Sequence, residues 1–145
     1  MMKTTGPVRE MFDNCTASRV RLIARSVSSI YDQAVARHGV TIAQVNLLVT
    51  LADFGPSTLR KIGEFLRLER STMSRNLDLL MKRGWVEAIS SNARGIREVA
   101  ITPVGLDIIE AVLPDWRAAQ TQAAQLLGQD GMELVNEAAS SIWNT

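Results

Sequence analysis

The sequence has little of what catalysis or metal binding requires. Of its 145 residues, one is cysteine, one is histidine and 5% are aromatic. A single cysteine excludes an internal disulfide framework, which is compatible with a reducing cytoplasm. Cys15 and His38 are separated by a largely helical stretch, roughly 30 Å long at ~1.5 Å per residue, so they cannot form a catalytic dyad within one chain. Because the sequence also contains no glycine-rich phosphate loop, no HExxH motif and no paired cysteines, we expect neither an enzyme nor a cofactor or metal site.

Long hydrophobic runs are missing as well. The most apolar stretch, IAQVNLLVTLA, is interrupted by Gln44, Asn46 and Thr50, and the N-terminal MMKTTGPVREMF has no apolar signal core. We therefore expect a cytoplasmic protein without a membrane span. Since 46% of the residues are hydrophobic and 21% are charged, we expect one compact domain, or a small domain whose arms complete their core in an oligomer.

Positive charge is scarce overall but concentrated in the middle of the chain. The net charge is +1, yet residues 59–101 contain nine Lys or Arg against five Asp or Glu, and the remainder contains seven against ten. A basic module between neutral or acidic arms is typical of a protein with one face that meets a polyanion. A solvated charged surface explains the same distribution equally well.

Helical periodicity is strong in the first half of the sequence. It predicts a long first helix over residues 16–37, ended by His38 as a C-terminal cation and by Gly39 as a left-handed cap. Thr41 and Gln44 are spaced as a capping box that opens a second helix. The inward residues of this second helix are predicted to be Ile42, Val45, Val49 and Ala52.

Two further helices follow, and the second of them is unusual at its start. Ser57 is the predicted N-cap of a short third helix, whose apolar side is formed by Leu59, Ile62, Phe65 and Leu66. The fourth helix, in ERSTMSRNLDLLMKRGWVE (69–87), ends at Gly84 and is predicted to pack through Met73, Leu77, Leu80 and Met81. Its first turns are polar, although Ser, Thr and Asn are mediocre helix formers. These polar residues are Ser71, Thr72, Ser74, Arg75 and Asn76.

The pattern then changes from helices to strands. Residues 85–89 and 97–101 favour β structure, and the intervening SSNARG is typical of a turn, so a hairpin is predicted. The Thr102-Pro103 pair is an N-cap followed by a first-turn proline, and it begins a long helix toward Gly128. A last helix is predicted over about residues 130–143.

This order of elements indicates a winged helix-turn-helix within a mainly α protein that carries a small β-hairpin wing. In such folds the first residues of the recognition helix meet base edges in the major groove, where hydroxyls and a guanidinium can form hydrogen bonds. The apolar stripe behind them holds the helix on its scaffold. We therefore interpret the polar start of the fourth helix as a DNA-reading face.

Two segments carry a resemblance to a known family. They are LRKIGEFLRLERSTMSRNLDLLMKRGWVE (59–87), with its S-T-x-[ST]-R start, and the end of the wing, ITPVG (101–105). In these segments and in the order of its elements, the chain resembles the MarR-type transcriptional regulators over nearly its whole length. The resemblance implies a homodimer that reads a pseudo-palindromic operator and is released by a small ligand. It implies a dimerisation region in residues 1–39 and 103–145, and a DNA-binding lobe in residues 40–102.

The resemblance also implies individual roles. Major-groove contacts fall on Ser71, Thr72, Ser74 and Arg75, with Asn76 on the same face. Arg94 falls on the wing arginine that reaches the minor groove, and Arg97 lies further along. Family wings usually read Asp-Arg-Arg, whereas this wing reads NARG (92–95) and lacks the aspartate that braces the arginine. Phosphate contacts are predicted for Arg60, Lys61, Arg70, Lys82 and Arg83, although solvated charge explains these residues equally well.

Apolar residues in the outer segments favour the dimer. A winged lobe alone cannot bury residues that lie outside it on both sides. They are Val8, Met11 and Phe12, placed before the first helix, and Leu134, Val135, Ile142 and Trp143 near the end.

Three hypotheses for function remain. The favoured one is a repressor released by a small aromatic ligand near Tyr31 and Trp116, which lie on the long helices that flank the family's ligand crevice. The second is a redox-sensing repressor, because Cys15 stands at the start of the first helix, where backbone N–H groups and Arg19 lower a thiol pKa. Against this, a lone cysteine is more often a small apolar residue. The third is a winged helix used as a protein–protein adaptor, which predicts no salt-dependent affinity for DNA.

Overall fold

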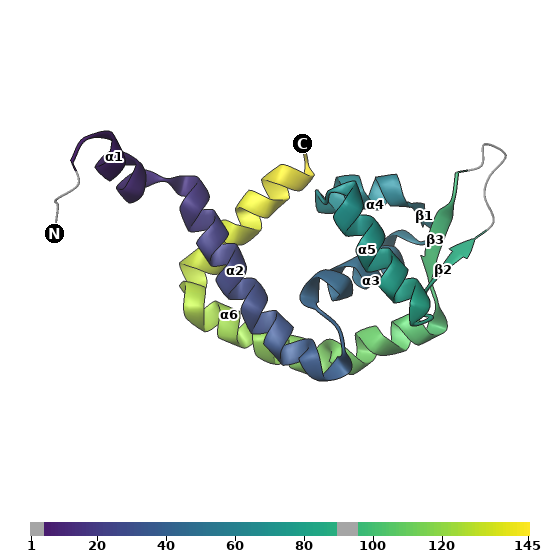
Figure 1. Ribbon diagram of the computed structural model, residues 1–145. Coiled ribbons are helices and arrows are strands. Elements are labelled where there is room, and N and C mark those ends of the chain that lie inside the picture. Colours follow the sequence, from purple (N-terminus) through teal and green to yellow (C-terminus); the bar gives the residue numbers. More distant parts are fainter. Residues whose placement is uncertain (1–4, 90–95) are drawn as a thin grey trace.

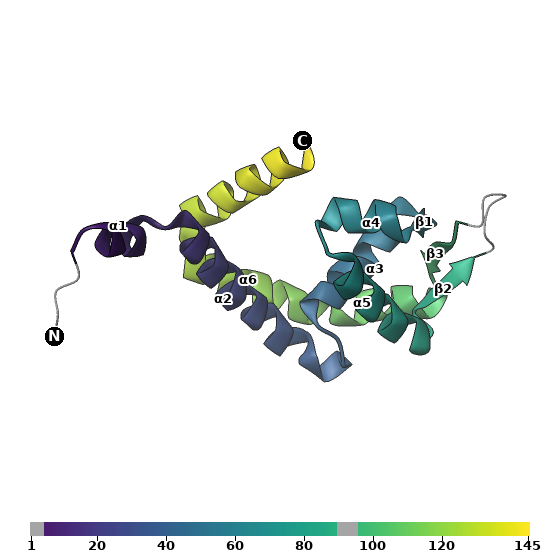
Figure 2. The ribbon, with the colours of Figure 1, turned by 45° about the horizontal axis from the view of Figure 1, so that its top comes forward.

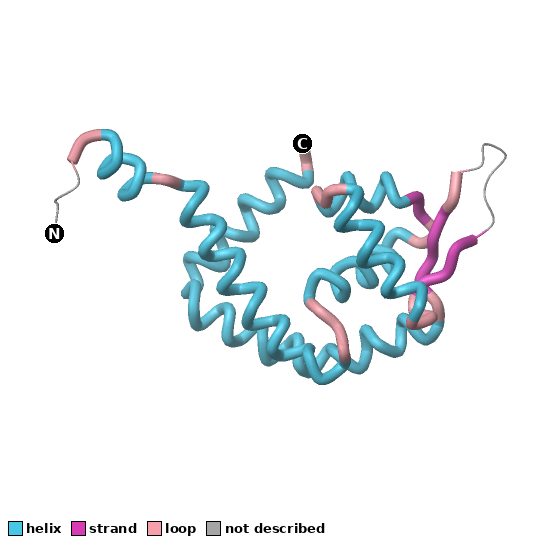
Figure 3. Tube along the Cα trace, in the orientation of Figure 1, coloured by secondary structure: helices cyan, strands magenta, loops and turns pink. Residues whose placement is uncertain are grey.

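The chain folds into a winged lobe attached to an arm of two long helices (Figure 1). The computed structural model describes residues 5–89 and 96–145. Figure 3 shows that helices dominate and that the strands are confined to one corner of the lobe. In chain order the elements are α1 (Pro7–Asn14), α2 (Thr16–Val35), η1 (Ala36–His38), α3 (Ile42–Phe54), β1 (Ser57–Thr58), α4 (Leu59–Leu66), α5 (Arg70–Lys82), β2 (Val86–Ile89), β3 (Glu98–Ile101) and α6 (Pro103–Trp143).

The arm is formed by α2 and α6, which run side by side in both ribbon views (Figures 1 and 2). Gly128 interrupts α6 with φ 73° and ψ 169°, so the predicted division into two helices is confirmed. The treatment of residues 8–12 as a segment before the first helix is wrong, because they lie in α1. Pro7 occupies the first turn of α1, where its fixed φ favours a helix start and its missing N–H is no loss.

Helix α3 is the central helix of the core. Its predicted capping box is confirmed, since the Thr41 hydroxyl accepts from the Gln44 N–H and the Gln44 side chain accepts from the Thr41 N–H. The predicted inward face is wrong at its C-terminal half, where Val49 is 44% exposed and Ala52 is also exposed. This helix contacts α2, α4, α6 and β3, so the buried side of α3 is wider than the predicted inward face and is turned relative to it. That side is formed by Leu47, Leu48 and Leu51, which are fully buried.

The wing is a three-stranded antiparallel sheet in the order β1-β3-β2. The predicted hairpin is confirmed, with Val86 opposite Ile101. Ser57 is not the N-cap of α4, because it pairs with Val99 as part of β1 and its hydroxyl donates to the Gly55 carbonyl at 2.9 Å. Thr58 is the cap instead, accepting from the Lys61 N–H at 3.2 Å.

Thr102 is the N-cap of α6, as the sequence predicts, and it also ties this helix to the start of the wing. Its hydroxyl accepts from the Gly105 N–H at 3.1 Å and donates to the Gly84 carbonyl at 2.6 Å. A Cβ at Gly105 would lie 2.2 Å from the Trp85 carbonyl oxygen, so only glycine fits at this close approach. The junction thereby connects the residues between α5 and β2 to the start of α6.

No single helix in residues 5–89 and 96–145 is long and apolar enough to cross a membrane. The segments Pro7–His38 and Ile42–Phe54 satisfy the length and composition of a span only when taken together, with a bend of 79°. The second of these segments supplies the buried core described above.

Candidate nucleic-acid interface

Helix α5 has a polar side in its first turns and a buried side behind it. Ser71 and Arg75, one turn apart, are exposed, and the other polar residues of these turns are partly exposed: Thr72, Ser74 and Asn76. The buried side is narrower than predicted, because Met81 is 38% exposed. The stripe that anchors the helix is Met73, Leu77 and Leu80. This arrangement presents hydroxyl, amide and guanidinium groups outward on a helix held from behind.

The turn before α5 sets where this polar face begins. Arg67 ends α4 in the left-handed conformation with φ 53°, and the Leu68 N–H donates to the Gly63 carbonyl at 3.0 Å. Ile62, which is fully buried, anchors α4 from within the core. Glu69 occupies the N-cap of α5, and its side chain makes no capping hydrogen bond. The first backbone N–H groups of α5 are therefore available to solvent or to a phosphate.

The wing lies beside α5 at the start of β3. Arg97 is exposed, and it lines a small groove of about 140 Å³ together with Ser74 and Asp78 of α5. The structure therefore brings one predicted wing residue next to one predicted major-groove residue. The other predicted wing residue, Arg94, lies outside the described residues.

Two of the predicted phosphate contacts, Arg60 and Arg70, lie together beside the helix-turn-helix. Arg60, Arg67 and Arg70 line a cleft of about 960 Å³ whose apolar wall includes Leu59, Leu68 and Met73. Within it, the Arg60 guanidinium pairs with Glu64 at 2.8 Å, and this pairing raises the pKa of Arg60. No sequence prediction covers Arg67. Its position in the short turn between the two helices, flanked by Arg60 and Arg70, was the signal available for it.

The remaining predicted phosphate contacts are placed differently. The Lys61 ammonium lies 4.9 Å from the centroid of the Phe54 ring. Lys82 is the last residue of α5, roughly 18 Å from Arg70 at ~1.5 Å per residue, so the structure does not bring it to the polar end of the recognition helix. The Arg83 guanidinium donates to the Gly39 carbonyl at 2.6 Å, in the segment between η1 and α3.

Tyr31 and Trp116 meet where α2 and α6 pack together. Their ring centroids are 6.5 Å apart at an interplanar angle of 47°, and the Tyr31 hydroxyl donates to the Gln120 side chain. Partial burial raises the pKa of Tyr31. The two aromatic residues named for a ligand thus lie together on the arm, with the Tyr31 hydroxyl paired to Gln120.

Cys15 is the N-cap of α2 and is partly exposed. Hydrogen bonding from Ser18, first through its backbone N–H, lowers the pKa of the Cys15 thiol, and the charge of Arg19 contributes less. The thiol shares a shallow groove with apolar residues of α1 and α2, namely Val8, Met11, Phe12 and Leu22. The direction of the pKa shift agrees with the sequence argument, although Ser18 rather than Arg19 is the main cause.

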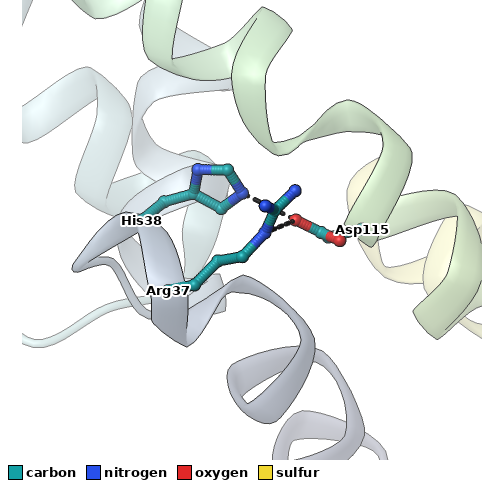
Figure 4. Close-up of polar contacts among 3 residues, drawn as sticks. All are labelled: Arg37, His38 and Asp115. Carbon is teal, nitrogen blue, oxygen red and sulfur yellow. Dashed lines mark hydrogen bonds and ion pairs between the residues drawn. The ribbon is translucent and has the colours of Figure 1, made fainter.

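The segment between the arm and the lobe is held by a small charged cluster (Figure 4). Asp115 of α6 accepts from Arg37 Nε and contacts His38 Nε2, both at 2.7 Å from the same carboxylate oxygen. The contact with His38, followed by that with Arg37, lowers the pKa of Asp115. His38 is thus a helix-end residue, as predicted, and it also joins the end of η1 to α6.

The family model that matches this chain is that of the MarR family, over residues 38–95. That range contains α3, α4, α5 and β2 of the winged lobe. Over these residues the chain is similar to the MarR family. The matched family is one of winged helix-turn-helix transcriptional regulators and not of enzymes, and the matched range is the part of the chain that forms the winged lobe.

Solved structures of MarR-like proteins share the fold over almost the whole chain. A probable transcriptional regulator from Pseudomonas aeruginosa has 21% identity and a TM-score of 0.78, covering 90% of this chain and 98% of that one. A mutant MarR from E. coli complexed with operator DNA has 17% identity and a TM-score of 0.79, with 92% and 96% covered. BpsR of Bordetella bronchiseptica, whose DNA binding is regulated by 6-hydroxynicotinic acid, has 18% identity and a TM-score of 0.76, with 90% and 96% covered. No curated protein sequence matches the chain.

Proposed function

We propose that this protein is a homodimeric repressor of the MarR type that reads a pseudo-palindromic operator and leaves it when a small aromatic ligand binds. The observation that carries the proposal is the division of α5 into an exposed polar start and a buried apolar back. Ser71, Thr72, Ser74, Arg75 and Asn76 would meet base edges, because the first residues of a recognition helix enter the major groove.

The basic residues around α5 would position the duplex. Arg70 and Arg60 lie beside the polar start of the helix, where phosphates flank the groove, and Lys61 and Lys82 would extend the contact along α4 and to the far end of α5. Arg97, which directly precedes β3, and Arg94 would contact the minor groove. Each such contact adds affinity that falls as salt rises, because counterions are released from the DNA.

The dimer is supported by apolar side chains that the single chain leaves exposed on both sides of the arm. Met11 is 71% and Phe12 is 76% exposed in α1, and Trp143 is 57% exposed at the end of α6. Val20 and Leu22 on α2, and Leu126, Leu134 and Ile142 on α6, are exposed as well. A second copy that covers these residues would remove them from water and pair two recognition helices about 34–36 Å apart, one turn of DNA.

The ligand proposal rests on the Tyr31–Trp116 pair and on the behaviour of relatives. The pair lies on the arm, so a ligand bound there could favour one arrangement of arm and lobe over another. BpsR, which shares the fold, is regulated by an aromatic acid. A redox-sensing repressor is the second candidate, and the lowered pKa of the partly exposed Cys15 thiol is the observation in its favour.

The test begins with DNA selected from a random pool by the purified protein. Fluorescence anisotropy with the selected duplex and with a scrambled duplex, over a range of salt concentrations, should give a specific complex whose log Kd rises linearly with log salt, by ~0.9 for each phosphate neutralised. The double variant Ser71→Ala/Arg75→Ala is the matched control, and it should bind both duplexes alike. A protein that selects no sequence and shows no salt-dependent affinity would be a protein–protein adaptor instead.

A further inference from the structure

The C-terminal end of α5 is attached to the segment that joins the arm to the lobe. Arg83 directly follows the helix, and its backbone N–H donates to the Leu79 carbonyl at 3.2 Å, so its backbone is fixed by the last turn. Its guanidinium donates to the Gly39 carbonyl at 2.6 Å and lies 4.9 Å from the centroid of the buried Trp85 ring. The same guanidinium therefore makes a hydrogen bond and a cation–π contact, and both partners lie outside α5.

The backbone conformation of Gly39 and its lack of a side chain leave room for this guanidinium. It adopts φ 71° and ψ 26°, a left-handed conformation that closes η1, and its N–H donates to the Ala36 carbonyl at 2.9 Å. A Cβ at this position would lie 2.9 Å from Nη1 of Arg83. Any residue other than glycine would thus strain the backbone and displace the Arg83 side chain.

The segment that contains Gly39 is fixed to both long helices of the arm. Asp115 of α6 holds Arg37 and His38 at 2.7 Å, and Asp32 of α2 accepts from the Ile42 N–H at 2.7 Å. These contacts flank Gly39 on both sides within the chain. The Arg83–Gly39 hydrogen bond therefore joins the recognition helix to a segment that moves with the arm.

We infer that Arg83 and Gly39 are positioning residues that set the angle between the recognition helix and the arm, and so determine which half-site spacing the protein reads. This inference rests on the proposed homodimer. In a dimer the two arms are joined, so the orientation of each α5 relative to its own arm fixes the separation of the two helices. Arg83 acts here through α5 rather than by binding a phosphate, which replaces the phosphate contact predicted for it.

The experiment measures the affinity for the operator selected by the parent protein and for a panel of altered operators. In these operators the two half-sites are one base pair closer together, or one or two base pairs further apart. A shift of two base pairs should cost the parent on the order of 100-fold in affinity, because the second half-site can no longer be engaged with the first. Arg83→Gln should lose about tenfold at the original spacing and much less across the panel, because one of the contacts that hold the recognition helix to the arm is removed and its orientation is less restricted.

Lys82→Gln is the matched control, since it removes the same charge from the neighbouring residue. It should weaken binding uniformly over the panel, keep the original optimum, and lower the salt slope by about 1. Arg83→Lys separates charge from geometry, because lysine keeps the charge but lacks the rigid planar donor fork. If Arg83 acts by position, Arg83→Lys should resemble Arg83→Gln. Gly39→Ala changes the partner residue of the same contact, and it should also reduce the difference in affinity between half-site spacings.

A second measurement does not depend on DNA affinity. Spin labels at Leu79→Cys on each protomer, in a Cys15→Ser background, report the distance between the two α5 helices by electron–electron double resonance. Arg83→Gln should broaden or shift this distance distribution, and Lys82→Gln should leave it unchanged. If the parent binds DNA with a sharp spacing optimum and Arg83→Gln keeps both that optimum and the parent distance distribution, the inference is wrong while the proposed function stands. If the parent selects no DNA, the proposed function fails first.

Discussion

The carboxylate of Asp115 and the imidazole of His38 meet at 2.7 Å and join the middle of α6 to the end of η1. Arg37 binds the same oxygen, so one carboxylate holds two consecutive residues of the segment that leads into the winged lobe. Asp115 is 25% exposed as a side chain, which keeps the cluster in contact with solvent. Its protonation should therefore follow the pH of the medium and weaken the junction between arm and lobe.

The first prediction concerns the pH dependence of stability. Because the folded-state pKa of Asp115 is lowered, the carboxylate stabilises the fold above its unfolded pKa, and this contribution is lost as the pH falls through the lowered value. Asp115→Asn should lower Tm near pH 7 and should make Tm less sensitive to acidification than in the parent. Thermal unfolding followed by circular dichroism between pH 7 and pH 3 measures this. Asp107→Asn, an exposed carboxylate of the same helix, should keep the parent profile; identical profiles for Asp115→Asn and the parent would contradict the role of Asp115.

The second prediction concerns base reading. Arg75 is exposed one turn after Ser71, so Arg75→Ala should cost about 1–3 kcal/mol at the selected operator and relax its base preference. Arg70→Ala, at the first position of the same helix, should instead weaken specific and scrambled duplexes alike and reduce the salt slope by about 1. Competition binding with single-base operator variants distinguishes the two effects. Parent-like affinity of Arg75→Ala for the operator would show that the assigned face is not the one that reads DNA.

The third prediction concerns the junction of wing and arm. Thr102→Ala removes the cap from the Gly105 N–H and the donor to the Gly84 carbonyl, so it should lower the free energy of unfolding by about 1–3 kcal/mol. Thr102→Ser keeps the hydroxyl and should cost less than about 1 kcal/mol. Urea unfolding at a fixed protein concentration measures both, because a dimer's stability depends on concentration. Equal losses for the two variants would mean that the methyl group, not the hydroxyl, is what matters at this position.

Comparison of the sequence predictions with the structure shows which signals suffice. Local hydrogen-bonding chemistry was predicted correctly at Thr41 and Thr102, because a cap depends only on residues within one turn. The polar start of α5 was found for a similar reason, since periodicity separates its two sides. In each case the information lies within a few consecutive residues.

The errors arise where distant segments decide the outcome. Ser57 was assigned to a cap because nothing near it reveals that β3, some forty residues later, draws it into a sheet. Val49 was placed inward because periodicity cannot tell which side of a very apolar helix meets four other elements. The Arg83–Gly39 contact was missed for the same reason, as 44 residues separate its partners and a basic residue after a recognition helix suggests DNA first.

The fourth prediction concerns assembly. The exposed apolar residues of α1 and of the end of α6 should be covered by a second copy, so light scattering at micromolar concentration should give about twice 15.9 kDa. Phe12→Asp should lower the measured mass toward that of one chain, because it places a charge in the apolar surface. Val104→Asp, at an exposed position beside the wing, should leave the mass of the dimer unchanged. A stable 15.9 kDa species for the parent would remove the dimer and, with it, the inference on half-site spacing.

The fifth prediction decides between the two proposed signals. Ser18 lowers the pKa of the Cys15 thiol, so the rate of alkylation of Cys15 by iodoacetamide should reach its midpoint at a lower pH than that of free cysteine. Reactivity alone does not make Cys15 a sensor, because Tyr31 and Trp116 lie elsewhere on the arm, with Tyr31 roughly 24 Å along α2 at ~1.5 Å per residue.

Aromatic acids such as 6-hydroxynicotinic acid should therefore be tested for release of the parent and of Cys15→Ser from the selected operator, and both proteins should respond alike. Tyr31→Phe, which keeps the ring but loses the hydroxyl that donates to Gln120, should weaken the response. Release of the parent by stoichiometric peroxide, with Cys15→Ser still bound, would reverse the ranking and make the thiol the primary signal.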